Sequence, residues 1–235
     1  MAPVATPTLV RGARASRSTI TLKLAMAGSG LLFIFFVLSH MYGNLKAFSG
    51  ELSFNSYAEH LRELGEPLLP YSGALWILRL GLIAALVVHV VSAVLLARRA
   101  SAARTVSYAV KKNKHSSFSS RTMRWGGVTL LVFLAWHLLN FTIVKVNPSG
   151  GETNNPYRLM VDTFDLWWMT LIYLVAMAAL ALHLHHGTFS AFQTLGLTNS
   201  AVARTRARVA GWVLAVVVAG GFSLVPISVL LGIID

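Results

Sequence analysis

Residues 180–196 read L-A-L-H-L-H-H-G-T-F-S-A-F-Q-T-L-G, the end of a long apolar run followed by a short polar stretch. His183, His185 and His186 lie within one helical turn of each other in this stretch. A histidine inside a membrane helix is costly, and by default it marks a functional site that faces the bundle interior. The fold therefore depends on whether this run spans a membrane, and the function depends on which histidine meets a partner.

The composition is that of an integral membrane protein. Of the 235 residues, 55% are hydrophobic and only 12% are charged, and the mean hydropathy is +0.64. The net charge of +12 does not indicate nucleic-acid binding, because the basic residues lie in the gaps between apolar runs rather than in one stripe on a soluble fold. The chain has no cysteine, so a redox centre has to be held by histidine or methionine.

Five apolar segments are long enough to cross about 30 Å of hydrocarbon at about 1.5 Å per residue. They cover residues 24–45, 71–97, 125–146, 165–187 and 209–234. We therefore predict an all-α bundle of five transmembrane helices forming a single domain over residues 24–234, after a basic tail of residues 1–23. Residues 53–69 are expected to form an amphipathic helix on the outer surface, and residues 147–156 a turn-rich loop.

The charges separate between the two sides of this bundle. The tail, the second connection and the fourth connection hold four, eight and three of the 20 Lys and Arg residues, and no acid. All eight acids lie in the first and third connections or at Asp235. Because cytoplasmic loops carry the excess of Lys and Arg, we predict a cytoplasmic N-terminus and an external C-terminus.

One embedded histidine falls on each of the first four predicted helices. His40, His89, His137 and His183 are separated by 49, 48 and 46 residues. Measured from the flanking charges, His40 and His137 lie towards the outer half of the bundle, whereas His89 and His183 lie towards the inner half. Two imidazoles at one level on different helices are typical axial ligands of one haem. The spacing therefore predicts two b-type haems, an outer one on His40 and His137 and an inner one on His89 and the 183–186 cluster.

Two alternatives remain at this point. Any single embedded histidine is as readily explained by a hydrogen bond within the bundle, and a set of them also occurs in proton-conducting transporters. Within the cluster, residue 185 points about 200° away from residue 183, whereas residue 186 points about 60° away. Position alone thus favours His183 or His186 over His185 as the partner of His89.

Small residues precede two of these histidines. Ser29, which lies between Gly28 and Gly30, and Gly126 each come 11 residues before a histidine, His40 and His137 respectively. Eleven residues return to nearly the same helix face. We expect a second flat macrocycle to lie against these positions.

The motifs around the histidines are L-S-H-M-Y-G-N (38–44), V-V-H-V-V-S-A-V (87–94), A-W-H-L-L-N (135–140) and H-L-H-H-G-T-F-S-A-F-Q-T-L-G (183–196). With them the chain resembles, over residues 24–234, the five-helix dihaem cytochrome b subunit (b558 type) of succinate:quinone oxidoreductases and quinol:fumarate reductases. Members of that family place a ligand histidine four residues before a glycine. The resemblance therefore implies His183, four residues before Gly187, as the fourth ligand, with His185 and His186 as neighbours.

The resemblance also implies a role and partners. The chain would be the membrane anchor of succinate dehydrogenase in the bacterial cytoplasmic membrane, and would serve the tricarboxylic acid cycle and electron transport. A flavoprotein and an iron-sulfur subunit would dock on the cytoplasmic face, and electrons would pass through the inner and then the outer haem to quinone. The succinate-oxidising site would lie in the flavoprotein. Complexes of this family often form higher-order multimers.

Two further expectations concern direction and quinone. Some fumarate reductases of this family carry a glutamate two residues before the fourth ligand, where this chain has Ala181, so succinate oxidation is the expected direction. An outer quinone site is expected for a low-potential acceptor such as menaquinone, because electrons leaving a negative interior gain about 2.3 kcal/mol per charge per 100 mV. By resemblance its candidate polar residues are His60, Arg62, Glu63 and Glu66, and the alternative is that they form a solvated surface helix. The same two-haem pattern would also suit the anchor of another quinone-linked dehydrogenase.

Overall fold

The structure is a computed structural model that describes residues 18–103 and 118–235, and every regular element in these two ranges is a helix. Five helices are long and apolar enough to cross a membrane. They are α1 (Thr19–Leu45), α3 (Gly73–Ala102), α4 (Phe118–Leu138), α6 (Trp167–Thr194) and α7 (Ala201–Leu230). The prediction of an all-α, five-span bundle is confirmed. The residues of the basic tail up to 17, and residues 104–117 of the second connection, lie outside the described residues.

Each spanning helix extends beyond its apolar segment at one end. Helix α7 begins at Ala201 rather than near residue 209, because Ser200 caps it by accepting a hydrogen bond from the Ala203 amide. Helix α6 continues to Thr194, beyond the predicted end at residue 187. Hydropathy marks where a helix enters hydrocarbon, whereas capping groups mark where its hydrogen bonding ends.

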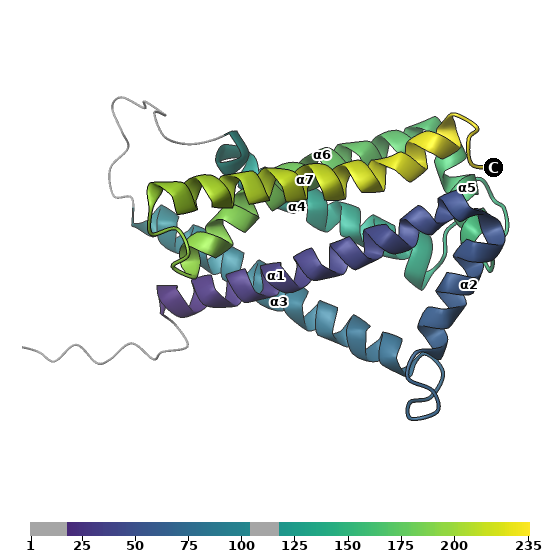
Figure 1. Cartoon of the computed structure of the whole chain (residues 1–235), viewed down its shortest axis with the longest axis horizontal. Coiled ribbons are helices and arrows are strands. Elements are labelled where there is room, and N and C mark those ends of the chain that lie inside the picture. The colour runs from purple at the N-terminus through teal and green to yellow at the C-terminus, as the bar shows by residue number, and fades with distance from the viewer. Residues whose placement is uncertain (1–17, 104–117) are drawn as a thin grey trace, which may run out of the picture.

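Two shorter helices lie at the end of the bundle that holds the C-terminus (Figure 1). After a 3₁₀ turn, η2 (Lys46–Ser49), the predicted surface helix is observed as α2 (Gly50–Glu63). It begins earlier than the predicted residue 53 and ends before Gly65, whose φ of +96° turns the chain. Helix α5 (Pro156–Asp165) was not predicted.

Helices α2 and α5 are joined by polar contacts. Arg158 forms an ion pair of 3.0 Å with Glu51, and Asn155 donates a 2.6 Å hydrogen bond to the same carboxylate. Tyr157 is buried and donates to the main-chain carbonyl of Asp235 at 3.2 Å. Burial raises the pKa of the Tyr157 phenol above its ordinary value, so the phenol stays protonated as this bond requires. These contacts hold the two short helices and the C-terminus together.

The long helices pack unequally. Helices α6 and α7 lie against each other along most of their length, α1 packs on α3, α6 and α7, and α4 packs on α6. Helix α3 packs mainly on α1, and in Figure 1 the two diverge towards the end that carries α2. Large apolar side chains such as Phe35, Val132 and Val216 point outward and are exposed, as lipid contact requires.

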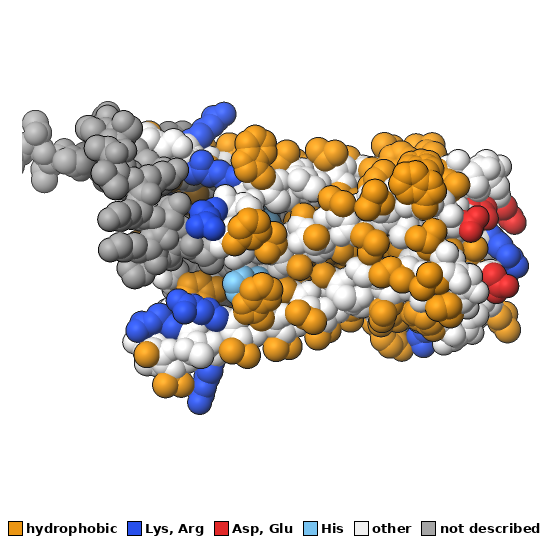
Figure 2. Space-filling view, turned by 90° about the horizontal axis from the view of Figure 1, so that it is seen from above, with side chains coloured by type: hydrophobic (Ala, Val, Ile, Leu, Met, Phe, Trp, Pro, Cys, Tyr) orange, Lys and Arg blue, Asp and Glu red, His pale blue; other side chains and the backbone are white. Residues whose placement is uncertain are grey.

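The two ends of the bundle differ in charge. In Figure 2 the Asp and Glu side chains gather at one end, whereas most Lys and Arg side chains lie at the other, with an apolar band between them. The basic end is the one where α1 and α7 begin, and the acidic end carries the C-terminus. The charge separation seen in the sequence is thus a separation in space. We call these the inner and outer ends, following the positive-inside prediction.

Gly211 on α7 provides a test of the tight α6–α7 packing. A Cβ at this position would stand 2.8 Å from the His185 carbonyl oxygen, so Gly211→Val is expected to push the helices apart. Overpacking of this kind costs about 1–3 kcal/mol, which a lower unfolding midpoint in detergent would report. Gly220→Val on the same helix is the matched control, since a Cβ there meets no atom within 4 Å. An equal loss of stability in both variants would contradict this view of the interface.

Candidate functional site

The structure brings the four predicted histidines together in two pairs. His40 on α1 and His137 on α4 place their ring centroids 5.8 Å apart at an interplanar angle of 79°. His89 on α3 and His183 on α6 place theirs 6.1 Å apart at 51°. All four residues are partly buried. Depth along the sequence predicted His40 with His137 and His89 with the 183–186 cluster, from which the family resemblance selected His183.

The separation within each pair fits a shared iron. A metal–imidazole bond is about 2 Å long, so the centroids of two rings ligating one metal from opposite sides stand about 6 Å apart. Within residues 18–103 and 118–235 no group of three or more His, Cys, Asp or Glu side chains is placed to hold a metal ion. Each site therefore offers two imidazoles, which suits a metal whose other ligands come from a macrocycle.

The pairs connect helices that are not close packing partners. Helices α1 and α4 do not form a main packing interface, and neither do α3 and α6. Their histidine rings nevertheless meet between them. Each histidine pair thus connects two helices that do not otherwise pack closely against each other.

Glycines of α1 and α4 lie beside the rings of the inner pair. A Cβ on Gly30 would lie 3.6 Å from the His89 ring, and a Cβ on Gly127 would lie 3.9 Å from the His183 ring. Each of these glycines comes ten residues before the outer-level histidine of its own helix, which corresponds to about 15 Å of rise. The sequence had placed the small residues of α1 and α4 near a second cofactor, and the contacts with the inner rings come from Gly30 and Gly127.

Aromatic rings surround the outer pair. Phe36 stacks on His40 with centroids 5.4 Å apart, and Phe222 lies 5.6 Å from the same ring. Phe133 and Phe141 lie 5.8 and 5.5 Å from the His137 ring. The outer pair therefore lies in an apolar environment, and its polar atoms depend on specific partners.

One histidine of each pair has such a partner. The Nδ1 atom of His137 lies 3.4 Å from the hydroxyl of Tyr173, and the Nδ1 atom of His89 lies 3.1 Å from the hydroxyl of Ser29. In contrast, the Nδ1 atom of His183 is buried without a hydrogen-bond partner among the described residues. A buried nitrogen without a partner is costly, so a hydrogen-bond partner for this Nδ1 atom would remove a penalty.

The other two histidines of the cluster face elsewhere. His185 stacks on Trp212 of α7 with centroids 4.2 Å apart, and its Nδ1 lies 3.0 Å from the Ser119 hydroxyl. The Nε2 atom of His186 lies 3.2 Å from the hydroxyl of Ser190 one turn later. Of the three, His183 is the histidine whose ring faces His89.

The predicted quinone residues lie at the outer end, away from the inner pair. Arg62 forms an ion pair of 2.9 Å with Glu59, whose other oxygen accepts a 2.7 Å hydrogen bond from Tyr71. The remaining three candidates, His60, Glu63 and Glu66, are exposed. The structure therefore groups Arg62 with Glu59 and Tyr71, which the sequence had not singled out, and leaves the other three on the surface.

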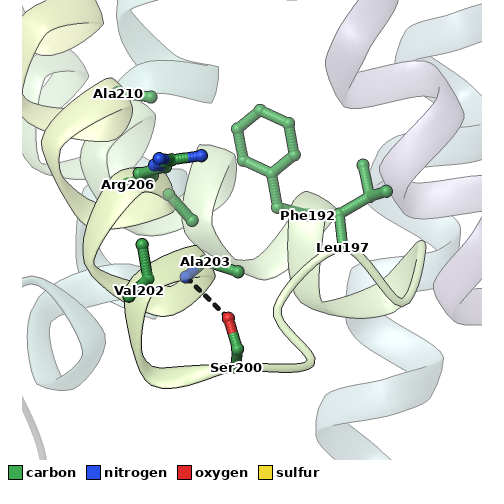
Figure 3. A pocket seen from close by; sticks show the side chains of 8 residues that line it. Phe192, Leu197, Ser200, Val202, Ala203, Arg206 and Ala210 are labelled. Carbon is green, nitrogen blue, oxygen red and sulfur yellow. Dashed lines mark hydrogen bonds between the residues drawn. The ribbon is translucent and has the colours of Figure 1, made fainter.

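A separate pocket of about 350 Å³ opens at the inner end, between the end of α6 and the start of α7 (Figure 3). Its lining is mostly apolar, and the Arg206 side chain extends towards the ring of Phe192. No histidine lines it. The pocket is thus distinct from both histidine pairs.

Sequence reasoning missed Tyr173 and the contact between Ser29 and His89. Tyr173 lies ten residues before His183 on α6, and ten residues is also the step from Gly30 to His40 and from Gly127 to His137. Applied to α6, this step would have placed Tyr173 at the level of the outer pair. Ser29 was noted only for its size, and its hydroxyl proves to be the relevant group.

Searches against models of known protein families, curated proteins and solved structures find no match to this chain. The functional argument therefore rests on the residues and their geometry.

Substitutions in the 183–186 cluster test which histidine is a ligand. If the pairs bind haem, as the sequence predicts, His183→Ala is expected to remove the inner haem, because it deletes the ring that faces His89. His185→Ala is expected to leave both haems bound, because His185 contacts Trp212 and Ser119 instead. Haem content per purified chain and the reduced-minus-oxidised spectrum measure both effects. Retention of two haems by the His183 variant would overturn the assignment.

Proposed function

We propose that this chain is the membrane-anchor cytochrome b subunit of a succinate:quinone oxidoreductase. In this role it binds two b haems, the outer one between His40 and His137 and the inner one between His89 and His183. The single observation that carries the proposal is the presence of two histidine pairs at two depths, with ring centroids 5.8 and 6.1 Å apart.

The chain's own residues supply what such cofactors need. The two histidines of each pair come from different helices, and their two imidazoles would hold the haem. Phe36, Phe133, Phe141 and Phe222 keep water away from the outer pair. When bound, the haems supply one-electron transfer between the two sides of the bundle.

The charge distribution supports the placing of partners. The basic inner end would face the flavoprotein and iron-sulfur subunits in the cytoplasm, although the positive-inside rule alone accounts for its charge. Quinone, with menaquinone as the expected type, would bind near the outer pair. The cluster of Glu59, Arg62 and Tyr71 offers both hydrogen-bond donors and acceptors at that end. Higher-order association of the whole complex remains part of the proposal.

Isolation of the intact complex tests this function. An affinity-tagged chain purified in mild detergent from its native membrane is expected to carry two haem b groups and to bring a flavoprotein and an iron-sulfur protein with it. The preparation is expected to reduce a menaquinone analogue with succinate. Two haems with a different dehydrogenase would instead indicate the anchor of another quinone-linked enzyme. Fewer than two haems per chain would contradict the ligand set.

The sidedness of the quinone site can be tested with the membrane potential. If electrons cross from the negative inside to an outer quinone, an inside-negative potential assists them by about 2.3 kcal/mol per charge per 100 mV. Adding an uncoupler to energised vesicles is therefore expected to slow the transfer from succinate to quinone. Detergent-solubilised enzyme, which has no potential, is the control and is expected not to respond. An unchanged rate in vesicles would argue for an inner quinone site.

A further inference from the structure

Tyr173 is the buried group through which His137 is connected to the rest of the fold. Its side chain is 5% exposed, and its hydroxyl lies between the Nδ1 atom of His137 at 3.4 Å and the Oδ1 atom of Asn140 at 2.9 Å. Asn140 itself is fully buried and lies in a π-helical turn, η3 (Leu139–Ile143), that follows α4 directly. Single π-helical turns of this kind often occur at functional sites.

The hydrogen bonds of Asn140 and Thr163 determine which atom donates in each contact between Asn140, Tyr173 and His137. The amide nitrogen of Asn140 donates to the Val146 carbonyl at 2.7 Å and to the Thr163 hydroxyl at 3.4 Å. The Thr163 hydroxyl gives its own proton to the Leu159 carbonyl at 2.6 Å, so its oxygen can accept from Asn140. A main-chain carbonyl can only accept, so the Val146 carbonyl must face the amide nitrogen of Asn140, and the Leu159 carbonyl must take the Thr163 proton. The amide oxygen of Asn140 therefore faces Tyr173, where it can only accept.

This order determines the tautomer of His137. Because Asn140 presents an acceptor, the Tyr173 hydroxyl donates its one proton to it. The Tyr173 oxygen then has only lone pairs to offer His137, so Nδ1 of His137 carries the hydrogen. The lone pair of the neutral ring is left on Nε2. The fold thus selects the ring nitrogen that is free to bind a metal.

Ser29 determines the tautomer of His89 in the inner pair in the same way, with a single side chain. Its hydroxyl directs its proton to main-chain carbonyls of the preceding turn, Ala25 at 2.8 Å and Met26 at 3.1 Å. The oxygen is therefore an acceptor for the Nδ1–H of His89 at 3.1 Å. In each pair one ring is fixed by a hydroxyl that belongs to another helix, Tyr173 of α6 or Ser29 of α1.

We propose that Tyr173 is a positioning residue for His137, which fixes Nε2 as the ligating nitrogen and lowers the reduction potential of the outer haem. The proposal rests on the function given above. A hydrogen-bond acceptor at Nδ1 makes the imidazole a more basic ligand through Nε2, and a more basic ligand favours the oxidised metal. Removing the Tyr173 oxygen is therefore expected to raise the potential of that haem and leave the other unchanged.

The experiment compares variants of the haem-loaded chain by a potentiometric titration that follows each haem by its spectrum. Tyr173→Phe is expected to retain two haems and to change the reduction equilibrium of the outer haem by about tenfold, which is ~59 mV for one electron. Tyr157→Phe is the matched control, because it removes a buried phenol of the same core cluster that has no contact with His137. It is expected to change neither haem. Ser29→Ala is expected to shift the inner haem alone.

Several results would overturn the proposal. An unchanged outer haem in Tyr173→Phe would do so, as would equal shifts in Tyr173→Phe and Tyr157→Phe. If Tyr173→Phe does not fold, Ser29→Ala decides whether a hydroxyl at Nδ1 controls its haem, and an unchanged inner haem then counts against the idea. The inner haem also serves as an internal reference for the integrity of each variant.

A second measurement separates this proposal from the proposed function. In the haem-free chain in detergent, ¹⁵N NMR of labelled histidine is expected to report His137 as the Nδ1–H tautomer, and Tyr173→Phe is expected to give a mixture of tautomers. If the wild-type chain binds no haem, the proposed function fails, and with it the claim about the potential. The NMR result then still decides whether Tyr173 fixes the tautomer, and a mixture in the wild-type chain would refute it.

Discussion

Hydrocarbon gives a polar side chain no water to bond with, and the interior of this bundle follows from that constraint. Within the spans many polar groups occur together and satisfy one another, as Tyr173 and Asn140 do, or they face a second imidazole. Even Ser29 directs its proton to its own helix before it accepts from His89. The rule is not met everywhere, since the Nδ1 atom of His183, the Nε1 atom of Trp136 and the Oγ1 atom of Thr188 are buried without a hydrogen-bond partner in the described part of the chain.

Packing accounts for where the pairs can form. Helices α6 and α7 approach closely enough that a Cβ on Gly211 would collide with a main-chain oxygen, so little can be held between them. Helix α3, by contrast, rests mainly on α1 and reaches α6 through the rings of His89 and His183. The bundle therefore combines the closely packed helices α6 and α7 with more loosely packed ones. Both histidine pairs lie between helices that pack loosely, α1 with α4 and α3 with α6. Under the proposed function, this division would let a bundle of apolar helices hold planar groups without losing its shape.

The sequence predicts the spans and the pairing because both depend on quantities that can be counted along the chain. Depth between flanking charges paired His40 with His137 and His89 with the 183–186 cluster, and the resemblance to a known family then selected His183. The rings of His40 and His137 and those of His89 and His183 lie against each other. Helix α5 escaped prediction because Asn155 followed by Pro156 is typical of a loop as well as of a helix start, where Asn caps and Pro occupies the first turn. Tyr173 escaped because its role depends on the π-helical turn that brings Asn140 beneath it, and no periodicity in the sequence indicates that turn.

The same constraint bears on how charge would move through the bundle. Helices α1, α3, α4, α6 and α7 contain no Asp or Glu, and Ala181, where some relatives of the proposed family have glutamate, packs in an apolar cluster beside Met177 and Leu184. Under the proposed function, electrons would then cross without a carboxylate to move a proton beside them. Uncompensated charge movement is driven by the membrane potential. Under the proposed function, the direction that the potential favours, from a negative inside outward, is also the one expected for succinate oxidation with a low-potential quinone as acceptor.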